Sequence, residues 1–173
     1  WSLCALFLGL CVLLGATQFD EPGLVPTDMR LLSFGAVIVG WVISLCLHEW
    51  AHAFVAYKSG DHSVVGRGYL TLDPRKYTDM LMSVVLPIVF LLIGGIPLPG
   101  GAVWIDHGNI RSRHRQALVS AAGPAVNILF GIVCMALAKS GLVDSSVALN
   151  STLVYLAWLE FLTAARTSPS GTP

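Results

Sequence analysis

The chain has 173 residues, 55% of them hydrophobic and only 12% charged, and its mean hydropathy is +0.73. An ordinary soluble domain is about 25% charged, so the composition argues against that class and indicates a membrane protein. Ten basic and ten acidic residues cancel to a net charge of zero, and no basic face or run stands out, so no nucleic-acid partner is expected.

Apolar segments long enough to be membrane-spanning helices, which need about 20 mostly apolar residues, recur along the chain. They cover residues 2–19, 33–57, 80–99, 117–138 and 147–165. The first lacks the basic start and small-residue cleavage site of a signal peptide, so we prefer a true span. We therefore expect an all-α polytopic membrane protein with about four to five transmembrane helices. They would form one membrane-embedded domain over residues 1–165, with its core at 33–138.

The segment 80–99 is rich in proline and glycine, which makes a continuous helix unfavourable. We expect a broken or re-entrant element, because irregular backbone is tolerated in a membrane where protein covers it or where it lines a water-filled cavity. The basic residues of loops 58–79 and 100–116 would then share one face, which the positive-inside rule makes cytoplasmic. If 80–99 crosses the membrane fully, these loops lie on opposite faces and the rule is uninformative.

Two histidines and a glutamate interrupt the apolar stretch LCLHEWAHAFVAY at residues 45–57. On a helix, His48 and His52 lie one turn apart, about 40° from each other around the axis, so both imidazoles can reach one metal ion. Glu49 lies beside them and can hold a metal-bound water. This H-E-x-x-H spacing predicts a zinc ion (Zn²⁺) with two histidine ligands and Glu49 as general base. A proton or ion relay is the alternative, since ionisable groups inside membranes are usually functional.

HEWAH on a membrane helix, followed by IPLPGGAVWID (96–106) and SAAGPAVN (120–127), resembles the site-2 protease family of intramembrane zinc metalloproteases. The resemblance implies that PLPGGAVWI forms a membrane-associated β-hairpin that binds an extended substrate, with Gly100 and Gly101 as substrate-binding residues. A simple glycine-rich turn is the alternative. RGYLTLD (67–73) alternates enough to be a second short strand or is an ordinary loop. Asn127 could hold the substrate backbone or make a packing hydrogen bond.

The third zinc ligand is missing from the pattern. A catalytic zinc takes three protein ligands and a water, and the resemblance implies an aspartate from a later LDG motif, which this sequence lacks. Asp144 lies in a short loop, and Glu160 is an intramembrane candidate to complete the site. Because the tail 166–173 is polar and the chain begins at Trp1, we expect a fragment, a truncated chain or a tail read out of frame.

The resemblance implies an intramembrane zinc metalloendopeptidase that cleaves membrane-embedded substrates, inactive as given if the third ligand is absent. Its partners would be a transmembrane protein substrate and the lipid bilayer. Two alternatives remain. The first is a non-catalytic membrane protein that retains the fold, and the second is an ion or proton relay based on the histidines. The compact chain resembles bacterial or archaeal multi-pass members. Counting residues from His48 to Lys58 places the site nearer that end of its helix, on the cytoplasmic face in the orientation above. The oligomeric state is not predicted.

Overall fold

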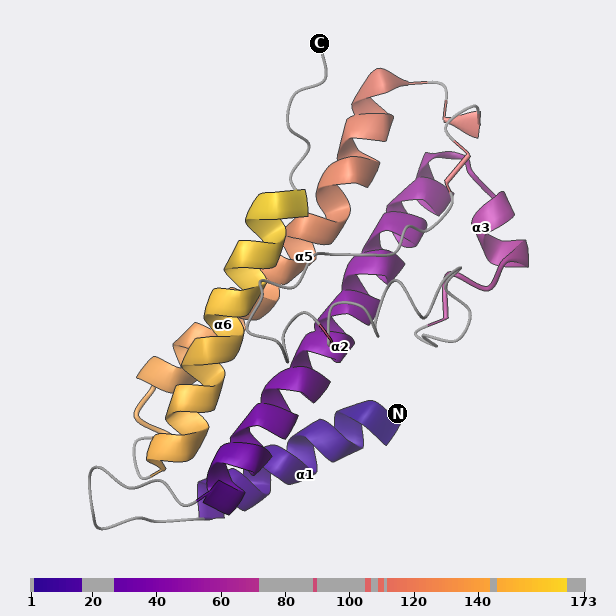
Figure 1. The fold of residues 1–173 in the computed structure, drawn as a ribbon. Helices are drawn as coiled ribbons and strands as arrows, with labels where there is room; N and C mark the ends of the chain where they lie inside the picture. The colour runs from indigo at the N-terminus through magenta and orange to yellow at the C-terminus, as the bar shows by residue number, and fades with distance from the viewer. Residues whose placement is uncertain are drawn as a thin grey trace. The chain divides into compact units, whose positions relative to one another are not determined.

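The computed structural model describes residues 2–16, 27–71, 89, 105–106, 109–110, 112–143 and 146–167. Within these ranges the regular elements are all helical, which confirms the all-α expectation for them (Figure 1). The elements in chain order are α1 (Ser2–Ala16), α2 (Thr27–Ser59), α3 (Ser63–Gly66), α5 (Arg113–Lys139) and α6 (Val147–Thr167).

Three helices are long and apolar enough to cross a membrane. They cover Arg30–Ser59, Arg113–Lys139 and Val147–Ala165, and correspond to the expected spans 33–57, 117–138 and 147–165. The first expected span is represented by a shorter apolar helix, Cys4–Leu14. The segment 80–99 lies outside the described residues apart from Val89, so the re-entrant element and the total of four to five spans stay predictions.

The expected β-hairpin falls almost entirely outside the described residues, which include only Ile105 and Asp106 of IPLPGGAVWID. For RGYLTLD, residues 67–71 form turns, so the strand alternative is wrong for that part. The N–H of Tyr69 donates to the carbonyl of Val64 at 3.1 Å, and Gly68 has φ of +74°. These local turn bonds use backbone groups that a strand ladder would require.

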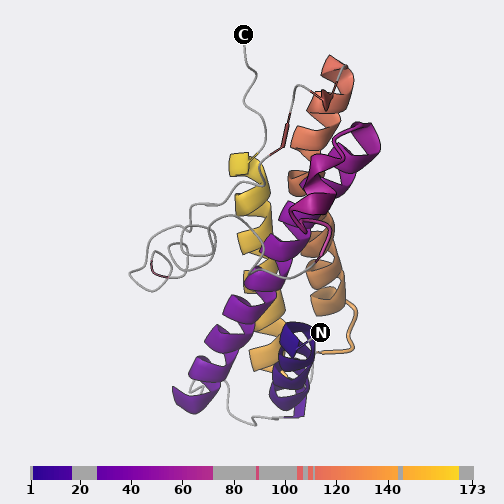
Figure 2. The same ribbon diagram turned by 90° about the vertical axis from the view of Figure 1, so that its right-hand side faces the viewer.

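Contacts divide the chain into two units, and α2, α5 and α6 each contribute to both. Unit 1 comprises Trp1–Ile43 and Leu129–Phe161, and unit 2 comprises Ser44–Ile128 and Leu162–Pro173. Figure 2 shows α2 as one continuous helix through this division. The expected single domain over residues 1–165 stays a prediction.

Unit 1 packs through glycines that lack a Cβ. A Cβ on Gly40 would lie 2.7 Å from Leu156 Cδ2 and 2.9 Å from Phe7 Cε2, and one on Gly131 would lie 2.8 Å from Phe161 Cε1. Helices in membranes associate closely where small residues line the contact. The two glycines therefore let bulky side chains of α1 and α6 rest directly on the backbones of α2 and α5.

The start of α6 is fixed by Ser146, which belongs to unit 1. Its hydroxyl oxygen accepts a hydrogen bond from the N–H of Leu149 at 3.3 Å, which is the geometry of a helix N-cap. The same hydroxyl donates to the carbonyl of Leu14 in α1 at 2.6 Å. One side chain thus caps α6 and joins it to the last described turn of α1.

The end of α2 lies in unit 2 and is terminated by Gly60. This glycine has φ of +114°, a conformation that favours a residue without Cβ. Its N–H donates to the carbonyl of Tyr57 at 3.2 Å, and the N–H of Asp61 donates to the carbonyl of Ala56 at 3.0 Å. This pair of bonds is the Schellman arrangement, which satisfies carbonyls that the helix end leaves open.

Asp61 follows Gly60 and is completely buried. Its carboxylate accepts hydrogen bonds from two segments of the chain. One carboxylate oxygen accepts from the Ser63 N–H at 3.0 Å and the Ser63 hydroxyl at 2.6 Å, and the other accepts from the Asp106 N–H at 2.9 Å. Burial acts to raise the pKa of Asp61, but these hydrogen bonds outweigh it and hold the pKa below its ordinary value. The carboxylate therefore fastens residues 105–106 to the end of α2.

Candidate metal centre

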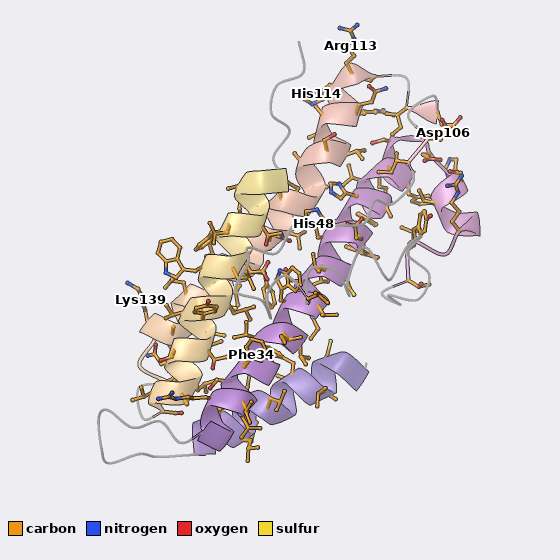
Figure 3. The ribbon with its side chains drawn as sticks, in the orientation of Figure 1. Phe34, His48, Asp106, Arg113, His114 and Lys139 are labelled. Carbon is orange, nitrogen blue, oxygen red and sulfur yellow. The ribbon has the colours of Figure 1, made fainter. Side chains whose placement is uncertain are left out.

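His48 and His52 lie on one face of α2, as their four-residue spacing predicts. Their Nε2 atoms are 3.1 Å apart, and the ring planes meet at 77°. His48 is 4% exposed and His52 is half-buried. Figure 3 shows His48 extending from α2 toward α5, and both helices contribute to unit 2 here. The helix thus brings two imidazole nitrogens to one point in a buried environment.

The other nitrogen of each ring is held by an acceptor from α5. His52 Nδ1 lies 2.6 Å from the main-chain carbonyl oxygen of Val119. His48 Nδ1 lies 3.2 Å from Oδ1 of Asn127, and the hydroxyl of Ser44 donates to the same Oδ1 at 3.5 Å. A main-chain carbonyl oxygen only accepts, so Nδ1 of His52 donates to Val119. With Oδ1 of Asn127 toward His48, Nδ1 of His48 donates in the same way, and Nε2 of each ring, when neutral, keeps its lone pair. Metal-binding histidines are held by outer partners of this kind.

Gly123 of α5 faces the two nitrogens with a bare Cα. A Cβ built there would lie 2.5 Å from His48 Nε2 and would also collide with His52 Nε2. No side chain larger than hydrogen fits without displacing the rings. Its absent side chain lets α5 approach α2 so closely that the imidazoles of His48 and His52 lie directly against the backbone of α5.

This arrangement fits zinc as two of its ligands. Two Zn–N bonds of about 2.0–2.1 Å at a tetrahedral angle separate their nitrogens by about 3.3 Å, and the observed separation is 3.1 Å. Among the described residues no three His, Cys, Asp or Glu side chains form a set that could hold a metal. Glu160 is fully buried in unit 1, and its candidacy as a ligand stays a prediction. Asp144 lies outside the described residues.

The other predicted site residues are Glu49, Gly100, Gly101 and Asn127, and the structure describes only some of them. Glu49 is half-buried beside His48 on α2, and its role as general base stays a prediction. Gly100 and Gly101 lie outside the described residues. Asn127 does reach the histidine pair, where it bonds to His48, and its predicted contact with substrate is untested.

Sequence reasoning missed Ser44 and the Val119 carbonyl. Ser44 gave a weak signal, because it is a hydroxyl one turn before His48 in an apolar run and therefore shares its face. The carbonyl gave none, because every residue carries one.

A profile of peptidase family M50 matches residues 36–166. Three bacterial relatives carry the name "Putative zinc metalloprotease": Rip2 of Mycobacterium tuberculosis, Rip2 of Mycolicibacterium smegmatis and YwhC of Bacillus subtilis. The first two are 45% and 41% identical over 127 residues, which cover 73% of this chain and 49% of each relative. YwhC is 31% identical over 101 residues, covering 56% of this chain and 42% of the relative.

The chain thus spans about half the length of the curated relatives it matches. No solved structure matches it significantly. The family profile covers most of the sequence, including all of α5 and the part of α2 that carries the histidine pair. The relatives' names agree with the donor atoms that meet at Gly123. This integral membrane chain therefore belongs to peptidase family M50, the site-2 protease family of zinc metalloproteases.

Proposed function

We propose that the protein is an intramembrane zinc metalloendopeptidase that hydrolyses peptide bonds of membrane-embedded protein substrates. The observation that carries the proposal is the pair of facing Nε2 lone pairs of His48 and His52 beside the bare Cα of Gly123. Both Nδ1 atoms face acceptors, so two neutral rings place no proton between nitrogens 3.1 Å apart. A bound cation removes this repulsion, whereas a buried imidazolium would cost desolvation free energy.

Zinc, when bound, would supply a water with lowered pKa and Lewis-acid polarisation of the substrate carbonyl. His48 and His52 would hold it through Nε2. The carboxylate of Glu49 would take a proton from the attacking water and return it to the nitrogen of the leaving amine. The segment with Gly100 and Gly101 would bind the substrate backbone as an added strand, and Asn127 is a further candidate for that contact.

The site would lie nearer the Lys58 end of α2, because the ten residues from His48 to Lys58 span about 15 Å of helix. Basic side chains are exposed at that end of unit 2, namely Lys58, Arg67, Arg113 and Arg115. The positive-inside rule makes this the cytoplasmic face of a bacterial cell membrane. A third protein ligand would come from residues beyond those described.

The first test is the zinc content of the detergent-purified protein and of His48→Ala, His52→Ala and His114→Ala. We expect about one zinc per native chain, almost none in the first two variants and a native content in the last. His114 is the matched control because it is an exposed histidine of α5. Equal zinc contents in all four proteins would reject the metal site and favour a histidine relay or a protein without metal chemistry.

The second test is cleavage of a model transmembrane substrate by the native protein and by Glu49→Gln. General base catalysis typically contributes about 10²–10⁴-fold, so we expect a rate loss of that order with an unchanged zinc content. Equal rates would reject Glu49 as the base. A native protein that binds zinc without cleaving any transmembrane substrate would instead indicate a non-catalytic member of the family.

A further inference from the structure

We propose that Asn127 is a positioning residue that selects the metal-binding tautomer of His48, and that Ser44 holds the Asn127 amide in the orientation this selection requires. The inference rests on the proposed zinc site and adds two residues to it. It starts from a difference between the two histidines. Both use Nδ1 to contact α5, but the chemical nature of the contacted group differs.

The tautomer of His52 is fixed by the main chain. Its Nδ1 lies 2.6 Å from the Val119 carbonyl oxygen, which can only accept a hydrogen bond. The proton must therefore reside on Nδ1 of His52, and Nε2 keeps its lone pair. No substitution at position 119 that preserves the helix removes this acceptor.

His48 also has a hydrogen bond with the main chain of Gly123, but the partner of its Nδ1 is a side-chain amide, which can present either an acceptor oxygen or a donor NH₂ group. With Oδ1 toward His48, as observed at 3.2 Å, Nδ1 carries the proton and Nε2 is free for a metal. With the amide turned by about 180°, Nδ2 would donate to Nδ1 and the proton would move to Nε2. A protonated Nε2 of a neutral ring cannot bind zinc.

The orientation of the Asn127 amide matters because the groups around it are buried. Asn127 and Ser44 are each 1% exposed and His48 is 4% exposed, so bulk water does not compete for these groups. The Ser44 hydroxyl donates to Oδ1 at 3.5 Å, which supports the amide orientation that has its oxygen toward His48. Nδ2 of Asn127 finds no hydrogen-bond partner among the described residues. The fold thus leaves a buried donor unsatisfied while presenting the amide oxygen to the ring.

The direct test is nitrogen NMR of the metal-free, ¹⁵N-histidine-labelled protein in detergent at about pH 8, where ordinary imidazoles are neutral. Protonated and unprotonated ring nitrogens have well-separated shifts. We expect the proton of His48 on Nδ1 in the native protein and in Asn127→Asp, which keeps an acceptor. In Asn127→Leu, which has no polar group, we expect His48 to shift to the Nε2–H form or to a mixture. Ser44→Ala should give a smaller shift in the same direction.

Two controls distinguish an effect on the tautomer of His48 from a general loss of stability: the ring of His52 and the variant Asn150→Leu. The proton of His52 should stay on Nδ1 in every variant, because the Val119 carbonyl is unchanged, whereas its Nε2 shift responds if His48 carries a proton on the Nε2 that lies 3.1 Å away. Asn150→Leu is the matched control, since Asn150 is also a helix asparagine, whose Nδ2 donates to the Ala138 carbonyl at 3.2 Å in unit 1. This variant should leave the tautomer of His48 native. A native His48 that carries its proton on Nε2 would overturn the proposal, even if Asn127→Leu cannot be folded.

A second readout is zinc affinity, measured by competition with a chelator. Outer partners of metal-binding histidines typically contribute about 10–100-fold, so we expect a loss of that size in Asn127→Leu and near-native affinity in Asn127→Asp. If native protein and His48→Ala bind zinc equally, the proposed metalloprotease function fails, and the NMR result still decides the tautomer. If zinc binding needs His48 but Asn127→Leu changes neither tautomer nor affinity, this inference alone fails.

Discussion

Gly40 in unit 1 and Gly123 in unit 2 are both buried glycines within a helix, and both lie against groups that a Cβ would strike. Gly40 faces a methyl group of Leu156 and the ring of Phe7, which can rotate or shift. Gly123 faces two imidazole nitrogens whose rings are held from behind by hydrogen bonds. The missing Cβ therefore permits close packing against apolar side chains in one unit and against the histidine pair in the other.

The largest effect that would sharpen this comparison is expected from Gly123→Ala. The added methyl group would occupy the space in front of both Nε2 atoms, and the anchored rings cannot retreat. We expect zinc affinity to fall by at least about a hundredfold, which corresponds to about 2.7 kcal/mol. Chelator competition measures this loss, and circular dichroism checks that the helices persist. Native zinc affinity in a folded Gly123→Ala protein would show that the metal does not occupy this space.

The next largest effect concerns Asp61, which anchors unit 2 by charge-assisted hydrogen bonds rather than by apolar packing. Asp61→Asn should lower the free energy of unfolding by about 1–2 kcal/mol near pH 7, because the charged acceptor is lost. Denaturant unfolding in mixed detergent measures the difference. Asp106→Asn is the control, since the Asp106 side chain is exposed and should matter less.

The pH dependence of the same variant has a defined sign. The pKa of Asp61 is lowered by folding, so its stabilisation is complete above the unfolded value of about 3.9 and is lost as pH falls through the lower folded value. The stability difference between native protein and Asp61→Asn should therefore shrink as pH falls below about 4. A difference that stays constant down to low pH would assign the effect to packing instead of charge.

A smaller effect is expected in unit 1 from Ser146→Ala, which removes the N-cap of α6 and its bond to Leu14. Loss of a serine N-cap typically costs about 1 kcal/mol. Thermal unfolding should show this loss while zinc affinity stays native. Ser151→Ala provides the control, because Ser151 is an exposed serine within the same helix. A change in zinc affinity would show that the packing of unit 1 influences the metal centre.

A loss of similar size to that of Ser146→Ala is expected from Gly40→Ala. Alanine is favoured over glycine inside a helix by about 1 kcal/mol, which partly offsets an overpacking cost of about 1–3 kcal/mol. The net loss should be about 1 kcal/mol, because the contacted atoms are flexible side-chain ends. Zinc affinity should remain native. A loss as large as that of Gly123→Ala would remove the distinction between the two glycines.

Much of the helical framework could be predicted, because it depends on local pattern. The expected span 33–57 lies within the observed Arg30–Ser59, and the spacing of His48 and His52 placed their rings together. For residues 67–71 of RGYLTLD the loop alternative is correct, because Gly68 adopts a positive φ that suits a turn. The expected hairpin around Gly100 and Gly101 remains untested by the described residues.

The partners of the site could not be predicted in the same way, because they are distant in sequence. Asn127 lies 79 residues from His48, and Val119 lies 67 residues from His52. The resemblance singled out Asn127, but it did not indicate which group the amide contacts. Asp61 shows the same limit, since the hydrogen bond from Asp106 spans 45 residues. Local periodicity places a side chain on a face, and only the packing of helices decides what it meets.

The hydrogen bond from His52 to the Val119 carbonyl has a consequence for comparing relatives. The side chain at position 119 is buried but takes no part in that bond, so a helix carrying leucine, isoleucine or alanine there presents the same oxygen. The residue type at this position can therefore change to any that fits the buried site while the imidazole stays anchored. A sequence comparison based on residue identity will therefore miss this hydrogen bond. A substitution that disrupts the helix backbone, such as proline one turn away, would be needed to remove the bond by mutation.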